Sequence, residues 1–281
     1  MVGRAISASI TILRSAAGGR RLRLAMSTLQ GYFDESGKLS DPNPGIVAFA
    51  GCISTYDGWQ SLSNRWNEIF DQVGIRSLHM KEVMSFRGDW RQFKDKEPER
   101  DDVLVELAKA VYKSSFFLLA APMLSQEFLA LPQAEQPRLK NLQYCGFETC
   151  VKGLSDSIST SITGPVKVQL ICDLSEEYSS ECLKLFIRLR RANKPLANLF
   201  PALTFGVDEG LLPLQVADMY AYCCRKHHIQ RNGLDTMPAV ISGLFDALHG
   251  GSGTEEGHMI YRAGKIDLGL GAIQREGTKG T

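Results

Sequence analysis

Four acidic residues stand at the ends of otherwise apolar segments of the sequence. Asp34 and Glu35 lie in GYFDESG, Asp173 ends QLICD, and Asp218 lies in LPLQVADMYAY. A carboxylate embedded in hydrophobic sequence tends to be partly buried, where it costs several kcal/mol unless it is paired, hydrogen-bonded or bound to a metal. These acids are therefore the first candidates for chemistry.

Strand alternation decides which acids of GYFDESG can share one centre. Tyr32, Asp34 and Ser36 are expected on one face of a strand, and Phe33 and Glu35 on the other. Asp34 and Glu35 could both reach one centre only if the strand bulged. Asp34 is therefore the preferred metal ligand.

The late helix carries a polar stripe. Steps of about 100° per residue place these residues on one side of it: Gln215, Asp218, Tyr222 and Arg225. Carboxylates from a first strand, a middle strand and this helix could converge on Mg²⁺ or Mn²⁺, which prefer oxygen ligands. Two such metals about 4 Å apart can clamp the attacking and leaving oxygens of a phosphodiester. The reaction indicated is phosphodiester hydrolysis.

Other interpretations of the same acids stay open. Asp34 could cap a turn with Ser36, Asp173 could cap the following helix, and Asp218 could neutralise a buried arginine. The protein would then be a non-catalytic binding or interaction protein with structural buried acids. A hydrolase of another phosphorylated substrate is a third interpretation.

The elements that must position these acids alternate between strands and helices. Two apolar runs joined by the turn residues of KLSDPNPG predict an antiparallel hairpin, and helical apolar spacing predicts the helix that follows. We expect a mixed α/β sheet covered by helices, with residues 74–98 as an irregular charged connection. The expected strands span residues 30–36, 45–54, 114–124, 166–173 and 202–207, and the expected helices span residues 54–73, 99–113, 139–157, 179–192 and 214–230.

The sequence divides into an extension, a domain and a tail. Residues 1–26 are rich in Ser, Ala and Arg and lack acids, which predicts a disordered extension before a translation start at Met26, or a mitochondrial presequence. Residues 27–249 are expected to form one domain. Residues 250–281 form a glycine-rich tail, in which MIYRAGKIDLGL could add an edge strand.

Composition excludes several classes of protein. Hydrophobic residues make up 44% and charged residues 22% of the 281 residues, as in a globular chain with a sizeable core. The longest apolar runs fall far short of the roughly 20 residues that cross a bilayer, so no membrane partner is expected. Seven cysteines without a CxxC pair predict reduced thiols and a cytoplasmic location. The sequence does not indicate which oligomeric state the protein adopts.

The formal net charge of +1 hides an uneven distribution. Residues 1–26 hold five arginines and no acid, so acids outnumber basic residues in the remainder. Non-specific nucleic-acid binders usually have a basic surface, because phosphate neutralisation supplies most of their affinity. The net charge therefore does not support a nucleic-acid partner, and such a partner would have to bind to local basic patches.

The order of the motifs is similar to that of a known family. YFDESG, the apolar run IVAFAGCI, SLHMKEV, a middle strand ending in Asp173, and LQVADMYAY resemble the uncharacterised bacterial and phage family labelled domain-of-unknown-function 3800. The resemblance covers roughly residues 30–230. The family reads tyrosine, any residue, DESG near its start, then a short histidine segment, and a QxxD motif near its end, which here runs from Gln215 to Asp218.

The resemblance implies a ribonuclease H-like fold, in which acids on the first strand, the fourth strand and a late helix hold two metal ions. A nuclease acting on DNA or RNA with Mg²⁺ or Mn²⁺ is the implied activity. Glu35 and Gln215 are implied supporting positions. VDEG departs from the family, whose members often have a serine and a lysine there, so whether Asp208 or Glu209 adds a ligand stays open. The implied metal ligands are Asp34, Asp173 and Asp218.

SLHMKEV adds candidates of its own. His79 could orient a nucleophilic water or hold the scissile phosphate, with Lys81 as a phosphate contact. A surface histidine in a loop is the alternative. Ser36 beside Asp34, and Arg225 on the polar stripe of the late helix, complete the supporting residues.

Two further patterns have a functional and a structural interpretation. Basic residues at 87–96 alternate with Phe86, Trp90 and Phe93, which could bind backbone phosphates and stack bases or form a solvated face. The run CCRKHH at 223–228 holds Cys and His four residues apart, a spacing that could contribute to a zinc site. Buried structural thiols are the favoured interpretation of the second pattern.

Overall fold

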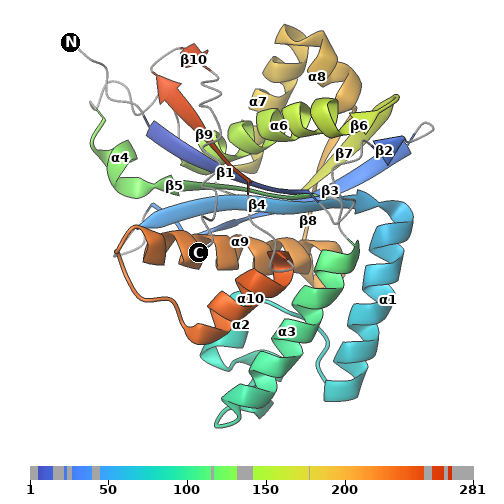
Figure 1. Ribbon diagram of the computed structural model, residues 1–281, viewed down its shortest axis with the longest axis vertical. Helices are drawn as coiled ribbons and strands as arrows, with labels where there is room; N and C mark the ends of the chain where they lie inside the picture. The colour runs from blue at the N-terminus through green and yellow to red at the C-terminus, as the bar shows by residue number, and fades with distance from the viewer. Residues whose placement is uncertain are drawn as a thin grey trace, which may run out of the picture.

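A mixed β-sheet runs through the molecule, with helices packed on both of its faces (Figure 1). Its strand order is β10-β9-β1-β5-β4-β3-β7-β8. The strands expected to carry Asp34 and Asp173 are neighbours in this order. The computed structural model describes residues 6–14, 22–23, 27–39, 45–114, 117–131, 142–176, 178–249, 255–262 and 265–267.

Five strands make up the part of the sheet that bears the acids. β3 (Ser27–Ser36) is antiparallel to β4 (Ile46–Thr55), which is antiparallel to β5 (Phe117–Leu124). On its other side β3 is parallel to β7 (Val166–Asp173), which is parallel to β8 (Leu203–Gly206). An antiparallel hairpin followed by strands that alternate with helices defines a ribonuclease H-like α/β fold, so the expected fold class is confirmed.

Shorter or more distant strands extend this core. β1 (Ile6–Arg14) pairs with β5 and with β9 (Glu255–Arg262), and β10 (Lys265–Asp267) pairs with β9. A separate ladder joins β2 (Leu22–Arg23) to β6 (Ile162–Thr163). The structure thus places strands both within residues 1–26 and within the tail, and the proposed domain limits stay a prediction.

Two layers of helices sandwich the sheet, as Figure 1 shows. One layer holds α6 (Leu142–Ser161), α7 (Ser179–Ala192) and α8 (Lys194–Leu199), and α4 (Ser125–Leu129) follows β5 directly. A distinct hydrophobic core fills each side of the sheet. The opposite layer consists of α1 (Tyr56–Val73), α2 (Met80–Ser85), α3 (Glu97–Ser114), α9 (Leu212–Arg231) and α10 (Ala239–His249).

The side chains of β3 alternate between the two cores. Leu29 and Phe33 belong to the core under α6 and α7, whereas Tyr32 packs against the core under α1 and α9. The ladder with β4 is continuous from Leu29 to Ser36, so no bulge interrupts this alternation. Asp34 consequently points to the α9 face and Glu35 to the α7 face.

Helix α1 begins and ends as its sequence predicts. The Thr55 side chain caps the helix by accepting a hydrogen bond from the Gly58 N–H at 3.1 Å, which satisfies one of the free donors of the first turn. Gly74 ends the helix with a φ of 71°, a left-handed conformation that glycine adopts at low cost. The apolar stripe between these ends buries Trp59, Leu62, Trp66, Ile69 and Phe70.

The connection over residues 74–98 is more ordered than expected. It contains α2 and the 3₁₀ helix η1 (Gly88–Phe93). Trp90 is fully buried, and its Nε1 donates to the Ser77 carbonyl oxygen at 3.0 Å. One buried indole therefore ties η1 to the segment that precedes α2, and the prediction of an irregular connection is wrong.

Two general expectations can be compared with the described residues. All seven cysteines are buried and free. Among the helices that the structure describes, none is long and apolar enough to cross a membrane.

Candidate active site

Asp34 and Asp173 occupy equivalent places on neighbouring parallel strands. Phe33 pairs with Cys172 in the ladder between β3 and β7, and each acid is the next residue of its strand. Side chains at paired positions of parallel strands share a face, so both carboxylates point toward α9, which packs across β3 and β4. The fold thereby brings the predicted acids of the first and middle strands together.

Asp34 is a crowded, buried carboxylate. Its exposed fraction is 9%. Burial raises the pKa of Asp34 well above its usual range, and the charges of Asp218, Glu35 and Asp173 raise it further. The Glu35 backbone N–H donates to Asp34 Oδ1 at 2.7 Å, and this hydrogen bond offsets only part of the increase in the pKa. The acids of the two strands and the late helix are thus close enough to repel one another.

Asp173 belongs to the same electrostatic cluster. Burial and then the charges of Asp208, Glu35 and Asp218 raise its pKa to about 6. Asp208 begins the 3₁₀ helix η2 (Asp208–Gly210), one turn before α9. Asp208 of VDEG therefore lies near the centre, and the side chain of Glu209 lies outside the described residues.

The QxxD motif holds the histidine segment through two backbone hydrogen bonds. Gln215 Oε1 accepts from the Leu78 N–H at 2.9 Å, and Asp218 Oδ2 accepts from the Met80 N–H at 2.6 Å. Residues three apart on a helix face the same way, and their side chains here meet alternate residues of the partner segment. The motif spacing therefore matches an extended strip of chain that runs alongside α9.

His79 lies between two of the acids. Its Nδ1 is 3.1 Å from Asp218 Oδ2 and 3.5 Å from Asp208 Oδ2, and its side chain is 45% exposed. The hydrogen bond to Asp218, together with the charges of Asp218, Asp208 and Glu82, raises the pKa of His79 to about 9 against the opposing effect of burial. The raised pKa favours the protonated imidazolium, which is suited to contact an anion.

Glu35 is held on the other face of the sheet. The Tyr178 hydroxyl donates to Glu35 Oε2, and burial raises the pKa of Glu35. Tyr178 was not among the residues that the sequence singled out. Only the position of Tyr178, just before α7, could have suggested that it faces the end of β3.

The supporting residues are divided between structural and exposed positions. Ser36 is buried at the end of β3, and Lys81 is exposed on α2. Arg225 turns toward the start of β4, where its Nε donates to the Ile46 carbonyl oxygen at 2.8 Å. Arg225 thus links α9 to the hairpin.

The glycine of DESG, Gly37, leaves space for the Arg225 side chain. Gly37 has a φ of +83°, and a Cβ added to it would lie 2.3 Å from Arg225 Nε. The left-handed backbone disfavours a side chain there, and any added Cβ would displace the Arg225 guanidinium. The motif therefore combines a candidate ligand, Asp34, with the turn that lets Arg225 anchor α9.

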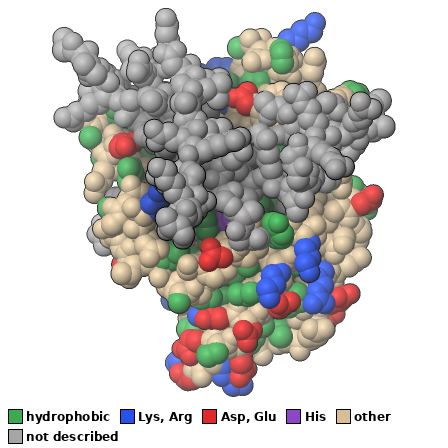
Figure 2. All heavy atoms as spheres, viewed as in Figure 1, with side chains coloured by type: hydrophobic (Ala, Val, Ile, Leu, Met, Phe, Trp, Pro, Cys, Tyr) green, Lys and Arg blue, Asp and Glu red, His purple; other side chains and the backbone are tan. Residues whose placement is uncertain are grey.

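The aromatic residues among the basic residues at 87–96 do not stack bases. Trp90 is fully buried and Phe93 is 6% exposed, and the Arg100 guanidinium lies 4.8 Å from the centre of the Phe86 ring. The base-stacking interpretation is therefore wrong, because these rings pack the connection onto the core. Figure 2 shows Lys and Arg side chains beside Asp and Glu side chains on the helical layer below the sheet, so this face carries both charges.

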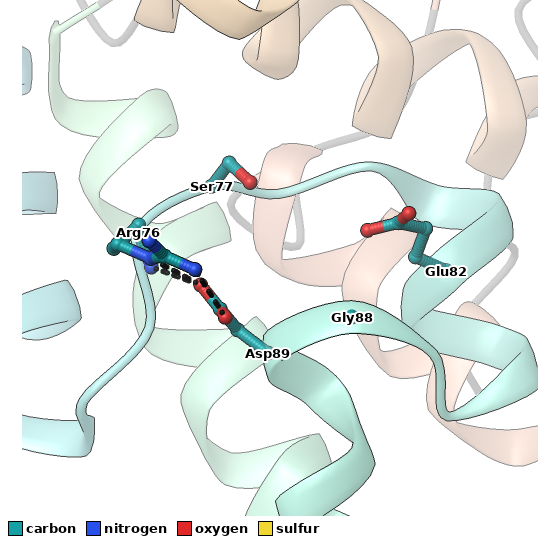
Figure 3. A pocket seen from close by; sticks show the side chains of 5 residues that line it. All are labelled: Arg76, Ser77, Glu82, Gly88 and Asp89. Carbon is teal, nitrogen blue, oxygen red and sulfur yellow. Dashed lines mark hydrogen bonds and ion pairs between the residues drawn. The ribbon is translucent and has the colours of Figure 1, made fainter.

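A pocket of about 290 Å³ lies in the same connection. Figure 3 shows that the side chains of Arg76 and Asp89, which line this pocket, point toward each other, and that Glu82 lies on α2. Arg76 Nη2 lies 3.0 Å from Asp89 Oδ1, and its Nε donates to Asp89 Oδ2 at 3.1 Å. The pocket's one arginine is thus already paired with its own aspartate.

Neither the CCRKHH run nor the acids form a ready coordination group. Cys223, Cys224 and His228 are buried, and the His227 ring stacks on Phe245 with centroids 4.0 Å apart, so this run packs α9 against α10. In the part of the chain that the structure describes, no three His, Cys, Asp or Glu side chains are arranged to hold a metal ion.

No protein-family model matches the chain, and no curated protein matches it. Its function must therefore be inferred from the chemistry of the site.

Proposed function

We propose that the chain is a metal-dependent phosphodiester hydrolase, a nuclease acting on DNA or RNA, with Asp34, Asp173 and Asp218 as ligands of Mg²⁺ or Mn²⁺. Membership of domain-of-unknown-function family 3800 is part of this proposal. The observation that carries it is that Asp34 and Asp173 lie side by side on parallel strands and face α9, where burial and the charges of three neighbouring acids raise the pKa of Asp34. Perturbed carboxylates gather at functional sites more often than elsewhere, and a bound cation would remove the repulsion among them.

The donor set fits a hard divalent cation. The three proposed ligands offer carboxylate oxygens, the donors that Mg²⁺ and Mn²⁺ prefer. Since these carboxylates do not form a coordination group in the described residues, binding must draw their side chains closer together. When bound, the metal would activate the phosphodiester as a Lewis acid.

The other residues of the site would bind and orient the substrate. His79 is half exposed and held at Nδ1 by Asp218, so its imidazolium can contact a phosphate oxygen while its ring stays fixed. Asp208, at 3.5 Å from the same nitrogen, would further restrict the orientation of the imidazole ring. Glu35 supports the end of β3 from the opposite face through Tyr178.

The first test is metal-dependent thermal stability. The unfolding midpoint of the full chain is measured in EDTA, Mg²⁺ and Mn²⁺ for the parent, Asp34→Asn and Asp218→Asn. A ligand that binds only the folded state at 100 times its Kd adds about 2.7 kcal/mol, so the parent midpoint should rise with metal and both variants should not respond. Asp71→Asn, an exposed change on α1, serves as the matched control and should respond like the parent.

Turnover then separates the substrate classes. Single- and double-stranded DNA and RNA oligonucleotides are compared with a small phosphodiester. Cleavage of an oligonucleotide that disappears in Asp34→Asn supports a nuclease, whereas turnover of the small ester without oligonucleotide binding supports a hydrolase of another phosphorylated substrate. A parent without metal response, together with variants that unfold early, would support the non-catalytic interpretation.

A further inference from the structure

The side-chain amide of Gln215 bridges two segments that are far apart in the sequence. Its Oε1 accepts from the Leu78 N–H at 2.9 Å, and its Nε2 donates to the Asp208 carbonyl oxygen at 3.1 Å. The side chain is 4% exposed. Both ends of one buried amide are therefore occupied by backbone groups from different loops.

These two loops carry His79, which contacts Asp218, and Asp208, which lies beside His79. His79 directly follows Leu78, and Asp208 is itself the residue whose carbonyl oxygen accepts from Gln215. His79 Nδ1 lies 3.1 Å from Asp218 and 3.5 Å from Asp208. A shift of the loop with His79 would change both separations, and a shift of the loop with Asp208 would change the second.

An amide supplies the donor and the acceptor that these two hydrogen bonds need. A glutamate offers acceptors alone when ionised, and a methionine of similar size offers no donor and only a weak acceptor. Loss of the amide would leave the buried Leu78 N–H without this partner, which is costly, whereas the Asp208 carbonyl oxygen would still accept from the Leu211 N–H at 3.1 Å. Glutamine at this position thus matches the two backbone groups that it meets.

We propose that Gln215 is a positioning residue that sets the places of His79 and Asp208 relative to Asp218. Its catalytic meaning rests on the proposed function, but the positioning itself does not. Asp218 still holds the Met80 N–H when Gln215 is changed, so the segment should loosen around Leu78 without detaching. The change therefore acts through the segments that carry His79 and Asp208, while the Asp218 anchor stays in place.

The structural arm of the test is amide hydrogen exchange in Gln215→Met. Exchange of the Leu78 N–H should accelerate by about tenfold, as expected when one hydrogen bond of a locally opening segment is lost, and exchange of the Met80 N–H should change less. Gln143→Met, the same substitution of a buried glutamine on α6, should leave the exchange of Leu78 as in the parent. Unchanged exchange at Leu78, or equal acceleration at core amides of β4, would overturn the proposal.

The functional arm is a double-mutant cycle on turnover. In Gln215→Met we expect kcat to fall by about tenfold with a smaller change in KM. Gln215→Met combined with His79→Gln should lose less activity than the product of the two single losses, because part of the Gln215→Met effect is exerted through His79. Independent, multiplicative losses would overturn the proposal. If the parent cleaves nothing, the proposed function fails, and hydrogen exchange alone decides whether Gln215 positions the loops.

Discussion

The carboxylate of Asp218 accepts a hydrogen bond from the backbone N–H of Met80 at 2.6 Å, so α2 begins on a side chain of α9. The first N–H groups of a helix lack partners within the helix, and a carboxylate there is favourable for the helix dipole as well. Asp218 is thus both a proposed metal ligand and the anchor of the segment that carries His79. A substitution can remove the first role while it keeps the second.

This double role predicts different effects for two substitutions of Asp218. Asp218→Asn keeps an oxygen that can accept from the Met80 N–H and loses only the charge beside His79, so its free energy of unfolding in EDTA should fall by less than that of Asp218→Leu. Asp218→Leu leaves that buried N–H without an acceptor and should lose about 2 to 3 kcal/mol. Urea unfolding of both variants measures the difference. Equal losses would show that the anchor does not depend on the oxygen.

The crowding around Asp34 predicts a variant that is more stable without metal. Burial and three neighbouring acids disfavour the charged form of Asp34, so removing the charge should relieve repulsion in the folded state. Asp34→Asn should therefore raise the free energy of unfolding in EDTA at pH 7 by about 1 kcal/mol. Asp71→Asn is the exposed control and should change little. A large loss of stability in Asp34→Asn would favour a structural role for this acid.

Local patterns were enough to predict the scaffold of the site. The turn residues between two apolar runs predicted the hairpin of β3 and β4, and alternation placed Asp34 and Glu35 on opposite faces, as the uninterrupted ladder has them. Helical spacing placed Gln215 and Asp218 on one stripe, and both indeed meet the segment at 78–80. These features depend on residues close in sequence, which periodicity reports directly.

The rest depends on contacts between distant residues. Tyr178 and Glu35 are 143 residues apart, and no spacing rule connects them. The helix α10 and the order within residues 74–98 were missed, because short elements there are held by tertiary packing such as the burial of Trp90. The same burial overturned the base-stacking interpretation, since interleaved aromatic residues look alike in sequence whether they face solvent or core.

The turn after β3 predicts a graded response to alanine. Gly37 and Gly74 both have positive φ angles, but a Cβ would meet Arg225 at Gly37 and nothing within 4 Å at Gly74. Gly74→Ala should cost about 1 kcal/mol for the left-handed backbone alone. Gly37→Ala should cost about 2 to 4 kcal/mol, because Arg225 must also leave the Ile46 carbonyl oxygen. Chemical denaturation measures both, and equal losses would refute the role of Arg225.

A buried histidine of α10, His249, predicts a stability change in mild acid. Burial lowers the pKa of His249 from 6.5 to about 4, and the charge of His227 lowers it to a smaller extent. The Phe245 carbonyl oxygen, 2.5 Å from Nδ1, and the charge of Asp246 raise the pKa but do not offset the effect of burial. Between these two pKa values the unfolded chain binds a proton that the folded chain does not. The contribution of His249 is therefore fully present above pH 6.5 and is lost as the pH falls toward about 4.

The size of this loss is on the order of 3 kcal/mol, large enough to measure by urea unfolding at a series of pH values. His249→Gln keeps a side-chain donor for the Phe245 carbonyl oxygen but does not titrate, so its stability should fall less steeply from pH 6.5 to pH 4 than that of the parent. His79→Gln is the matched control, because the pKa of His79 is raised to about 9 and its contribution is lost only as the pH rises from 6.5 toward 9. Parallel curves for the parent and His249→Gln in acid would mean that another group controls the acid transition.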